Sequence, residues 1–498
     1  MARIRFLRAL RILWVEYCEE NTISAMKYLT MSNQGLMDRG WWGKWVDNPI
    51  YISYETQQIP MWQVPFPAVT VCPIVQGKAQ YYDIDEAVDR AMHGGKLDRE
   101  DYNYLGALSH VCPTMSKYFK FGGKYSASTV EMLVDIALDF EQVFIICRWM
   151  NTYINCSKLW SQTITDSGVC FTFNSISVEN LYRLENLHRE FAYSEVSGMS
   201  DDWFRETGYT NNVDMQAYPR RQIGTGLRFG LKAFLLSYMF DDSYYCHGAK
   251  TGFKLFVHPP DEAPSFDQFY YHVSLRDSIS MMIKPQVTAT SQSLRSQPYK
   301  DRQCLFENER YLRFFRIYNQ HNCIQECMVN FTYDLCGCVK FSMPRSADMR
   351  ECAPSEISCY SGAYIKMYSQ QIGKNTSNPC GCLPACGSLS YDVEISNMPL
   401  DILSIFRAYG QDNANMSEFV MSQISISIKD KWILPMVRQE LMGVGDLVGT
   451  LGGLFGLMIG VSALSLLEIV YFCLIRPFRK EKPAPRKRYV IPWRNPYR

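Results

Sequence analysis

The sequence lacks the short motifs that mark the common classes of enzyme. It contains no phosphate-binding P-loop, no HExxH zinc motif and no GxSxG nucleophile motif. It has only seven histidines, and they show no metal-ligand spacing. We therefore predict that the protein is not an enzyme and that it holds no metal and no cofactor.

Long apolar runs are also scarce. Only one run is long enough to cross a membrane. Residues 447–475 are apolar, Gly or Ser, apart from Thr450 and Glu468. As a helix these 29 residues would measure about 43 Å, against about 30 Å of hydrocarbon in a bilayer. Basic residues follow at once, beginning with Arg476. This pattern predicts a transmembrane helix at 447–475 and a basic cytosolic tail at 476–498.

The net charge of +1 is small only because the two ends of the chain offset its middle. Residues 1–44 carry +3 and residues 476–498 carry +8, which leaves about −10 on residues 45–475. Basic ends are typical of cytosolic termini. The acidic middle argues against a nucleic-acid-binding surface there, which should be basic. We expect 1–44 to be a cytosolic N-terminal region and 45–446 to be extracellular.

A second membrane span is missing near the N-terminus. Residues 4–17 are interrupted by Arg5, Arg8 and Arg11, which is typical of an amphipathic helix on a membrane surface and not of a signal peptide. A chain with one span and no signal has no means to carry its middle region across the membrane. We therefore expect that a span belongs near residues 30–44 and that this chain lacks it.

The middle region carries two features of an oxidising compartment. Sixteen of the 18 cysteines lie between Cys72 and Cys386, which favours a disulfide framework. Zinc binding is the alternative, but the C-x-C pairs do not have the usual zinc spacing. Four glycosylation sequons occur in the same region, at Asn155, Asn330, Asn375 and Asn415. Together these features predict an extracellular domain.

The pattern of apolar residues predicts a mixture of strands and helices, an α+β domain. The helices are expected at Thr129–Phe140 and Arg310–His321. The strands are expected at Val69–Val71, Gly168–Asn174, Tyr270–Gln286, Tyr391–Ile395 and Val420–Ile428, of which Gly168–Asn174 alternates in polarity.

Several motifs coincide along the chain. FPAVTVC stands at 66–72, GVCFTFN at 168–174 and CGCLPxC at 380–386. Between them lie Cys304, Cys323-x3-Cys327 and Cys336-Gly337-Cys338, and the glycine-rich run GGLFGLMIGVSALSLLE ends the series at 452–468. This sequence resembles the degenerin/epithelial sodium channel family, most closely its insect pickpocket branch, over residues 12–29 and 45–478.

The resemblance implies a plasma-membrane protein with a palm, finger and thumb ectodomain, the thumb lying at about 304–386. It implies one subunit of a homo- or heterotrimeric, sodium-selective, amiloride-sensitive channel that passes Na+ passively. It also implies a set of disulfides, and the two cysteines left over are predicted to pair with each other. These pairs are Cys72–Cys170, Cys147–Cys156, Cys304–Cys386, Cys323–Cys382, Cys327–Cys380, Cys336–Cys359 and Cys338–Cys352, with Cys112–Cys246 as the remaining pair.

The resemblance places the selectivity filter at Gly460, Val461 and Ser462, where backbone carbonyls replace part of the hydration shell of Na+. Glycines spaced by four are otherwise typical of close helix packing. At Gly449 the family requires a small side chain for normal closing, and large residues hold the pore open. The expected pore-lining residues are Gly449, Gly453, Gly456, Ser465 and Glu468.

The sequence departs from the family pattern in two places. The His-Gly pair of the family is replaced by Ser24 and Ala25, and residues 30–43 stand where the family has its first membrane helix. The alternative reading is therefore a non-conducting, single-span Cys-rich receptor or regulatory subunit. A further hypothesis is pH sensing by Asp241 and Asp242 near His247.

Overall fold

The computed structural model describes residues 50–112, 115, 128–188, 202–209, 217–265, 269–374, 380–410 and 419–440, with seven single positions between 445 and 467. The chain divides into two units, Ile50–Gln439 and the two ends Met1–Pro49 with Glu440–Arg498. Within the described residues, none of the helices is both long enough and apolar enough to span a bilayer. The predicted span at 447–475 lies almost wholly outside the described residues.

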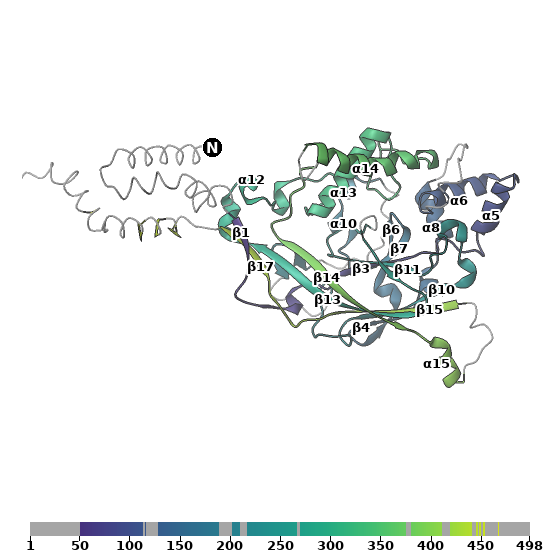
Figure 1. Cartoon of the computed structure of the whole chain (residues 1–498), viewed down its shortest axis with the longest axis horizontal. Coiled ribbons are helices and arrows are strands. Elements are labelled where there is room, and N and C mark those ends of the chain that lie inside the picture. The colour runs from purple at the N-terminus through teal and green to yellow at the C-terminus, as the bar shows by residue number, and fades with distance from the viewer. Residues whose placement is uncertain are drawn as a thin grey trace, which may run out of the picture. The chain divides into compact units, whose positions relative to one another are not determined.

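The unit Ile50–Gln439 is built around an eight-stranded sheet (Figure 1). Its strands run in the order β1-β17-β13-β15-β10-β4-β5, and β14 pairs with β13 as a branch. Most neighbours are antiparallel, but β13 is parallel to both β15 and β17. The strands are β1 Ile50–Tyr54, β4 Phe144–Trp149, β5 Thr152–Ile154, β10 Leu231–Tyr238, β13 Asp277–Thr290, β14 Ser388–Pro399, β15 Phe419–Ile428 and β17 Met436–Glu440.

A second sheet of five strands packs against the first, in the order β12-β11-β3-β7-β6. Two small pairs, β2 with β16 and β8 with β9, complete the strands. The two large sheets share one apolar core, to which β3 contributes Val69 and Val71 and β15 contributes Ile424 and Ile426. The strands are β2 Ile59–Pro60, β3 Ala68–Pro73, β6 Trp160–Thr165, β7 Gly168–Phe173, β8 Trp203–Phe204, β9 Gly208–Tyr209, β11 Phe253–His258, β12 Tyr271–Val273 and β16 Trp432–Ile433.

The expected strand at Gly168–Asn174 forms as β7, but its two faces are not different. Every residue of β7 and of its neighbour β3 is buried. A strand that is covered on both sides has no face toward solvent. The polar side chains of β7 therefore make hydrogen bonds inside the protein instead of facing water. Thr172 Oγ1, for example, lies 2.9 Å from Thr70 Oγ1 on the adjacent strand.

The longer helices form two groups. Helices α5, α6 and α8 share a core of their own with Cys112 and Cys246, and the first two begin at the N-caps Asp83 and Asp98. Helices α13 and α14 lie on the other side of β3, β7 and β11 from the eight-stranded sheet (Figure 1). The helices are α5 Ile84–Met92, α6 Arg99–Ser109, α8 Thr129–Ile136, α9 Phe140–Val143, α10 Val178–Leu181, α11 Tyr244–His247, α12 Tyr299–Arg302, α13 Gln320–Cys336, α14 Ile357–Lys374 and α15 Ile402–Ala408.

The helix predicted at Arg310–His321 is wrong. Helix α13 begins only at Gln320, where Asn319 accepts a hydrogen bond from the Asn322 backbone N–H. The residues before it are not helical. Phe315 forms a β-bridge with Tyr182, and the Glu326 carboxylate accepts the backbone N–H groups of two residues in that segment.

Two other segments are interrupted where the sequence suggested continuity. The helix expected at Thr129–Phe140 ends at Ile136, because Ala137 adopts an extended conformation. The strand expected at Tyr270–Gln286 is divided into β12 and β13 by a turn in which Arg276 has a φ of 63°. A single residue whose backbone leaves the conformation of the element is enough to end that element, and hydropathy does not report it.

Candidate functional site

The predicted pore residues lie at the edge of what the structure describes. Gly449 and Gly453 are helical and exposed, and no described atom would lie within 4 Å of a Cβ added to either. The filter residues Gly460–Ser462 lie outside the described residues. Gly456, Ser465 and Glu468 also lie outside them.

The strands at the two ends of the unit Ile50–Gln439 pair with each other. β1 and β17 are neighbours, and Gln439 Nε2 donates to Ser53 Oγ at 2.7 Å. The Glu55 backbone N–H also donates to the Pro435 carbonyl at 2.8 Å. Because β17 is also parallel to β13, the last strand before the glycine-rich segment is hydrogen-bonded to the long central strand of the sheet.

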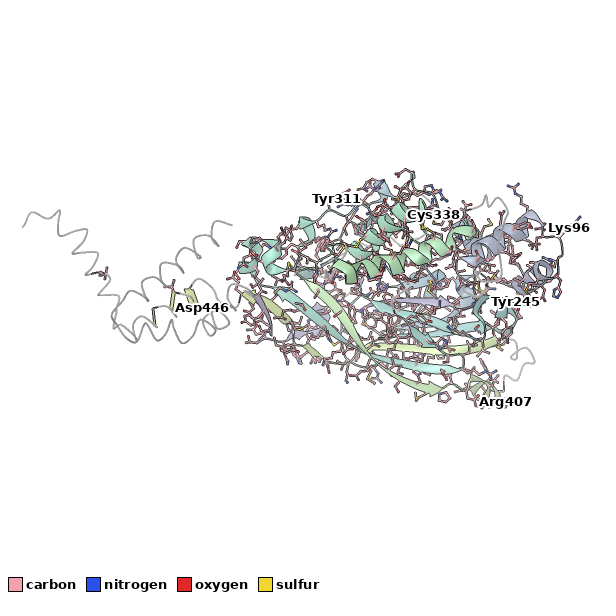
Figure 2. The ribbon with its side chains drawn as sticks, turned by 45° about the horizontal axis from the view of Figure 1, so that its top comes forward. Lys96, Tyr245, Tyr311, Cys338, Arg407 and Asp446 are labelled. Atoms are coloured by element: carbon pink, nitrogen blue, oxygen red, sulfur yellow. A yellow bond between two sulfur atoms is a disulfide. The ribbon has the colours of Figure 1, made fainter. Side chains whose placement is uncertain are left out.

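The eight disulfides of the structure join the cysteines in the pairs that the resemblance implied, together with Cys112–Cys246. Five of them lie within residues 304–386, here called the helical layer, which includes Cys338 in Figure 2. Cys323 and Cys327 are four residues apart on α13, so both face the segment that carries Cys380 and Cys382. The sulfurs of Cys338 and Cys352 lie near the Glu356 carboxylate, but a disulfide has no thiolate to bind zinc.

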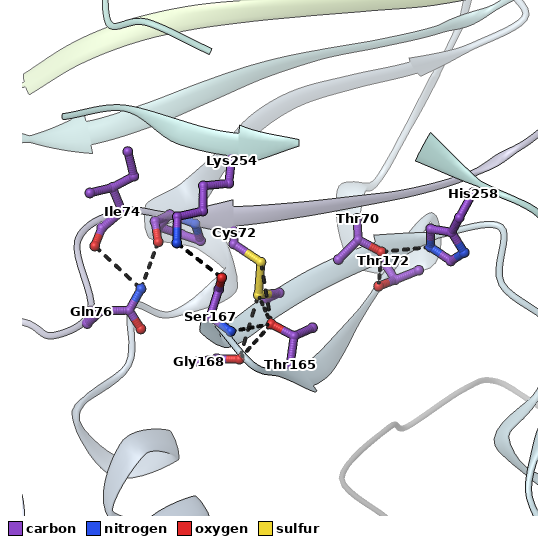
Figure 3. Close-up of a disulfide and its surroundings, with 12 residues drawn as sticks. Thr70, Cys72, Ile74, Gln76, Thr165, Ser167, Gly168, Thr172, Lys254 and His258 are labelled. Carbon is purple, nitrogen blue, oxygen red and sulfur yellow. Dashed lines mark hydrogen bonds between the residues drawn. A yellow bond between two sulfur atoms is a disulfide. The ribbon is translucent and has the colours of Figure 1, made fainter. Parts of the chain in front are cut away.

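The Cys72–Cys170 disulfide lies in a polar network between the ends of β3 and β7 (Figure 3). Thr165 Oγ1 lies 2.9 Å from Cys170 Sγ and 3.7 Å from Cys72 Sγ. Two residues before Cys72, Thr70 Oγ1 lies 3.0 Å from His258 Nε2. His258 Nδ1 faces the Pro259 carbonyl, which can only accept, so Nδ1 carries the proton and Nε2 accepts from Thr70. Burial lowers the pKa of His258 to about 3, which keeps this ring neutral.

Two of the four predicted glycosylation sites lie in the described residues. Asn155 and Asn330 are both exposed. The Asn155 side chain also accepts a hydrogen bond from Ser157 Oγ, the hydroxyl of its own sequon, at 2.9 Å. Asn375 and Asn415 lie outside the described residues.

The three residues considered for pH sensing contact different partners. Asp241 accepts the Ala79 backbone N–H at 2.9 Å, and burial raises the pKa of both Asp241 and Asp242. Burial lowers the pKa of His247 to about 4. No hydrogen bond or ion pair within the described part of the chain joins His247 to either aspartate, so the three do not form one titrating group.

A buried ionic cluster was not foreseen from the sequence. Arg205 donates to Asp261 through Nε and Nη2, both at 2.5 Å, and to Glu262 Oε1 at 3.1 Å. Burial raises the pKa of Glu262 to about 7, and the nearby arginine opposes that rise. The cluster fixes the segment after β8 to the segment after β11. Its members are 56 residues apart in the sequence, so only the fold brings them together.

Comparison with known proteins gives matches along almost the whole chain. The family pattern described as "Amiloride-sensitive sodium channel" matches residues 39–472. Pickpocket protein 28 of Drosophila melanogaster is 26% identical over 505 aligned residues, covering 93% of this chain and 78% of that protein. Sodium channel protein Nach of Drosophila melanogaster is 23% identical and covers 94% and 88%. Epithelial sodium channel subunit gamma of Xenopus laevis is 23% identical over 51% of this chain and 39% of its own length.

Proposed function

Because the chain belongs to the amiloride-sensitive sodium channel family, we propose that it is one subunit of a trimeric, sodium-selective channel of the plasma membrane that amiloride blocks. The subunit assembles with copies of itself or with sister subunits and passes Na+ down its gradient. Its termini are cytosolic, and residues 45–446 are extracellular. The helix at 447–475 lines the pore.

One observation carries this proposal. The family match runs through the disulfide-bonded unit and continues across the glycine-rich segment as far as residue 472. It therefore includes the filter candidates Gly460–Ser462 as well as the ectodomain. A receptor that shared only the ectodomain with this family would not be expected to match the family over the pore segment.

The proposed pore selects Na+ through backbone carbonyls at Gly460–Ser462, three copies of which form a narrow ring. Glu468 lies within the membrane segment, where an acidic residue is costly and is typical of an ion pathway. The net charge of about −10 on residues 45–475 raises the local concentration of cations near the pore mouth.

A substitution at Gly449 tests conduction without knowledge of the gating stimulus. Gly449→Phe places a large side chain where the family requires a small one, and no described atom lies within 4 Å of a Cβ added at this position. We expect Xenopus oocytes that express this variant to carry a constitutive inward Na+ current that amiloride abolishes. The wild-type chain, in the absence of its stimulus, is expected to carry much less.

Val448→Phe is the matched control, because Val448 is the helical, exposed neighbour of Gly449 on a different face of the helix. It should leave the current at the wild-type level. If Gly449→Phe reaches the cell surface in trimers and yet carries no more current than Val448→Phe, alone or with sister subunits, the proposal fails.

The alternative, a non-conducting regulatory subunit, is favoured by the polar residues 30–43 in place of a first span. A version of the chain with an apolar helix inserted between residues 29 and 45 decides between the two. Surface biotinylation and Na+ current are measured together. Surface delivery and current that both appear only after the insertion support a channel subunit whose first span is missing, whereas delivery without current in either version supports the alternative.

A further inference from the structure

The eight-stranded sheet has a small basic hollow on the face that points away from the apolar core. Its volume is about 260 Å³. Its lining includes three cations, Arg148, Arg228 and Lys232, and three hydroxyl groups, those of Ser278, Ser280 and Ser425. No Asp or Glu belongs to the lining as far as the structure describes it.

The register of the sheet explains why these side chains meet. Arg148 on β4 is directly opposite Lys232 on β10, and Lys232 is opposite Ser425 on β15. Ser425 is in turn opposite Ser280 on β13. Neighbouring strands lie about 4.8 Å apart, so the four residues form one continuous row across four strands.

A second row and a turn close the hollow. Gln423 lies opposite Ser278, two residues along from the first row. Asn151 belongs to the two-residue turn between β4 and β5, in which Met150 and Asn151 both have positive φ, as a type I′ hairpin requires. Met150 accepts this conformation while its side chain packs against the core of the two sheets.

The positive charges in the hollow form no ion pair with the part of the chain that the structure describes. None of the described ion pairs includes Arg148, Arg228 or Lys232. Instead the Arg148 guanidinium lies 3.8 Å from the centre of the Tyr153 ring. Lys232 Nζ lies 5.4 Å from the centre of the Phe234 ring. These contacts with aromatic rings orient the two cationic side chains but do not neutralise their charges.

The arrangement is unfavourable unless something of opposite charge fills it. Like charges directly opposite each other on neighbouring strands destabilise a sheet. Burial and the nearby Arg148 lower the pKa of Lys232, which is the expected response of an ammonium group to such surroundings. An anion between the two side chains would remove this repulsion.

We propose that the hollow binds a small oxyanion, a phosphate or a carboxylate, between Arg148 and Lys232. Guanidinium groups match pairs of oxygen atoms in such anions, and the hydroxyls of Ser280 and Ser425 supply further donors. The volume of about 260 Å³ accommodates an anion of about five heavy atoms with water, but not a folded partner. This site lies in the ectodomain and does not depend on whether the chain conducts.

The test is thermal unfolding of the purified full chain in detergent. Sodium phosphate and sodium succinate are each compared with sodium chloride at equal ionic strength. We expect one or both to raise the Tm by about 3 °C at a concentration far above Kd. Lys232→Gln and Arg148→Gln should abolish this rise. In chloride alone, each variant should be at least as stable as the wild type, because the repulsion is relieved.

Lys284→Gln is the matched control, since Lys284 is exposed on the same face of β13 but does not line the hollow. It should keep the full response to the anion. The proposal is overturned if neither anion stabilises the wild type, or if Lys284→Gln loses the response as completely as Lys232→Gln. A third result also overturns the proposal: Lys232→Gln dissociates the oligomer and no anion stabilises the wild type. A carboxylate of a neighbouring subunit would then occupy the hollow.

Discussion

The two-sheet region and the helical layer of residues 304–386 are stabilised in different ways. The two sheets share a large apolar core, in which Phe66, Trp149 and Phe173 form edge-to-face and tilted ring contacts. The helical layer holds five of the eight disulfides. Only two disulfides, Cys72–Cys170 and Cys147–Cys156, involve strands of the two sheets.

The composition of α13 explains this difference. Its buried residues include three polar side chains, Asn322, Glu326 and Thr332, beside three apolar ones. Because α13 buries as many polar as apolar side chains, it gains less from the hydrophobic effect than an apolar helix would. The disulfides add their restraint to the apolar core that the helical layer does have. The comparison predicts that the sheets are sensitive to cavities and that the helical layer is sensitive to loss of its bridges.

A cavity in the sheet core should have the largest effect. Phe173 is fully buried between Phe66, Trp149 and Trp160, so Phe173→Ala should lower the free energy of unfolding by about 3–5 kcal/mol. Urea unfolding followed by tryptophan fluorescence measures it. Phe240→Ala, at a side chain that is 43% exposed, is the control and should cost less than about 0.5 kcal/mol. Equal losses in the two variants would contradict a sheet core held by packing.

Loss of one bridge should come next and should remain local. The double substitution of Cys323 and Cys382 by Ser opens a link with a sequence separation of 59, at an expected cost of about 2–4 kcal/mol. Hydrogen exchange should accelerate in α13 and α14 and stay unchanged in β13. The pair Cys147 and Cys156, with a separation of 9, should cost about 1.5 kcal/mol less. Faster exchange in β13 would show that the two regions unfold together.

Acid should weaken the two-sheet region, and the contact between α6 and the helical layer, through buried histidines. Burial lowers the pKa of His258 in the sheets and of His110 beside Tyr360 to about 3. Because the ordinary value is about 6.5, the folded state binds fewer protons than the unfolded state below that pH. The free energy of unfolding therefore falls as pH falls from 6.5 toward 3, by at most about 2 kcal/mol per histidine between pH 6.5 and 5.

The pH dependence separates the two regions when each histidine is replaced by Gln. Unfolding of His258→Gln and His110→Gln, measured from pH 7 to 5, should show a shallower loss of stability than the wild type. In His258→Gln, hydrogen exchange of the amides near β3 should no longer accelerate in acid. In His110→Gln, the same should hold for the amides of α6 and α14. A wild-type slope in both variants would rule out these two rings as its source.

The smallest effect should follow from the buried carboxylate of α13. Glu326 accepts the backbone N–H groups of Arg313 and Phe314, both at 2.9 Å. Glu326→Gln keeps one acceptor and turns the other into a donor, at an expected cost of about 1–2 kcal/mol. Asp334→Asn, an exposed carboxylate on the same helix, is the control and should be nearly neutral in urea unfolding. If Glu326→Gln is equally neutral, the conformation of the segment before α13 does not depend on these two hydrogen bonds.

Much of the fold follows from local sequence pattern. The strands predicted at Val69–Val71, Tyr391–Ile395 and Val420–Ile428 all form. Only the first half of β15 alternates between buried and half-buried residues, as apolar alternation predicts. The helix predicted at Arg310–His321 does not form. Glu326 and a bridge to Tyr182 hold this segment in a non-helical conformation, and both partners lie outside it.

The basic hollow could not be predicted because it depends on register. Arg148, Lys232, Ser280 and Ser425 come from four segments, and each appears on its own as an ordinary outward-facing residue. Only the pairing of β4, β10, β15 and β13 aligns them. The filter at Gly460–Ser462 is the opposite case, since the sequence resemblance predicts it and it lies outside the described residues, so it stays a prediction.

The reversal potential of the Gly449→Phe current tests the central claim most directly. Oocytes expressing this variant are bathed first in Na+ and then in K+, and the amiloride-blocked component is isolated in each. A sodium-selective pore predicts a large shift of the reversal potential to more negative voltages in K+. A variant present at the surface that gives no amiloride-blocked current, or a current whose reversal potential is the same in Na+ and K+, would contradict it.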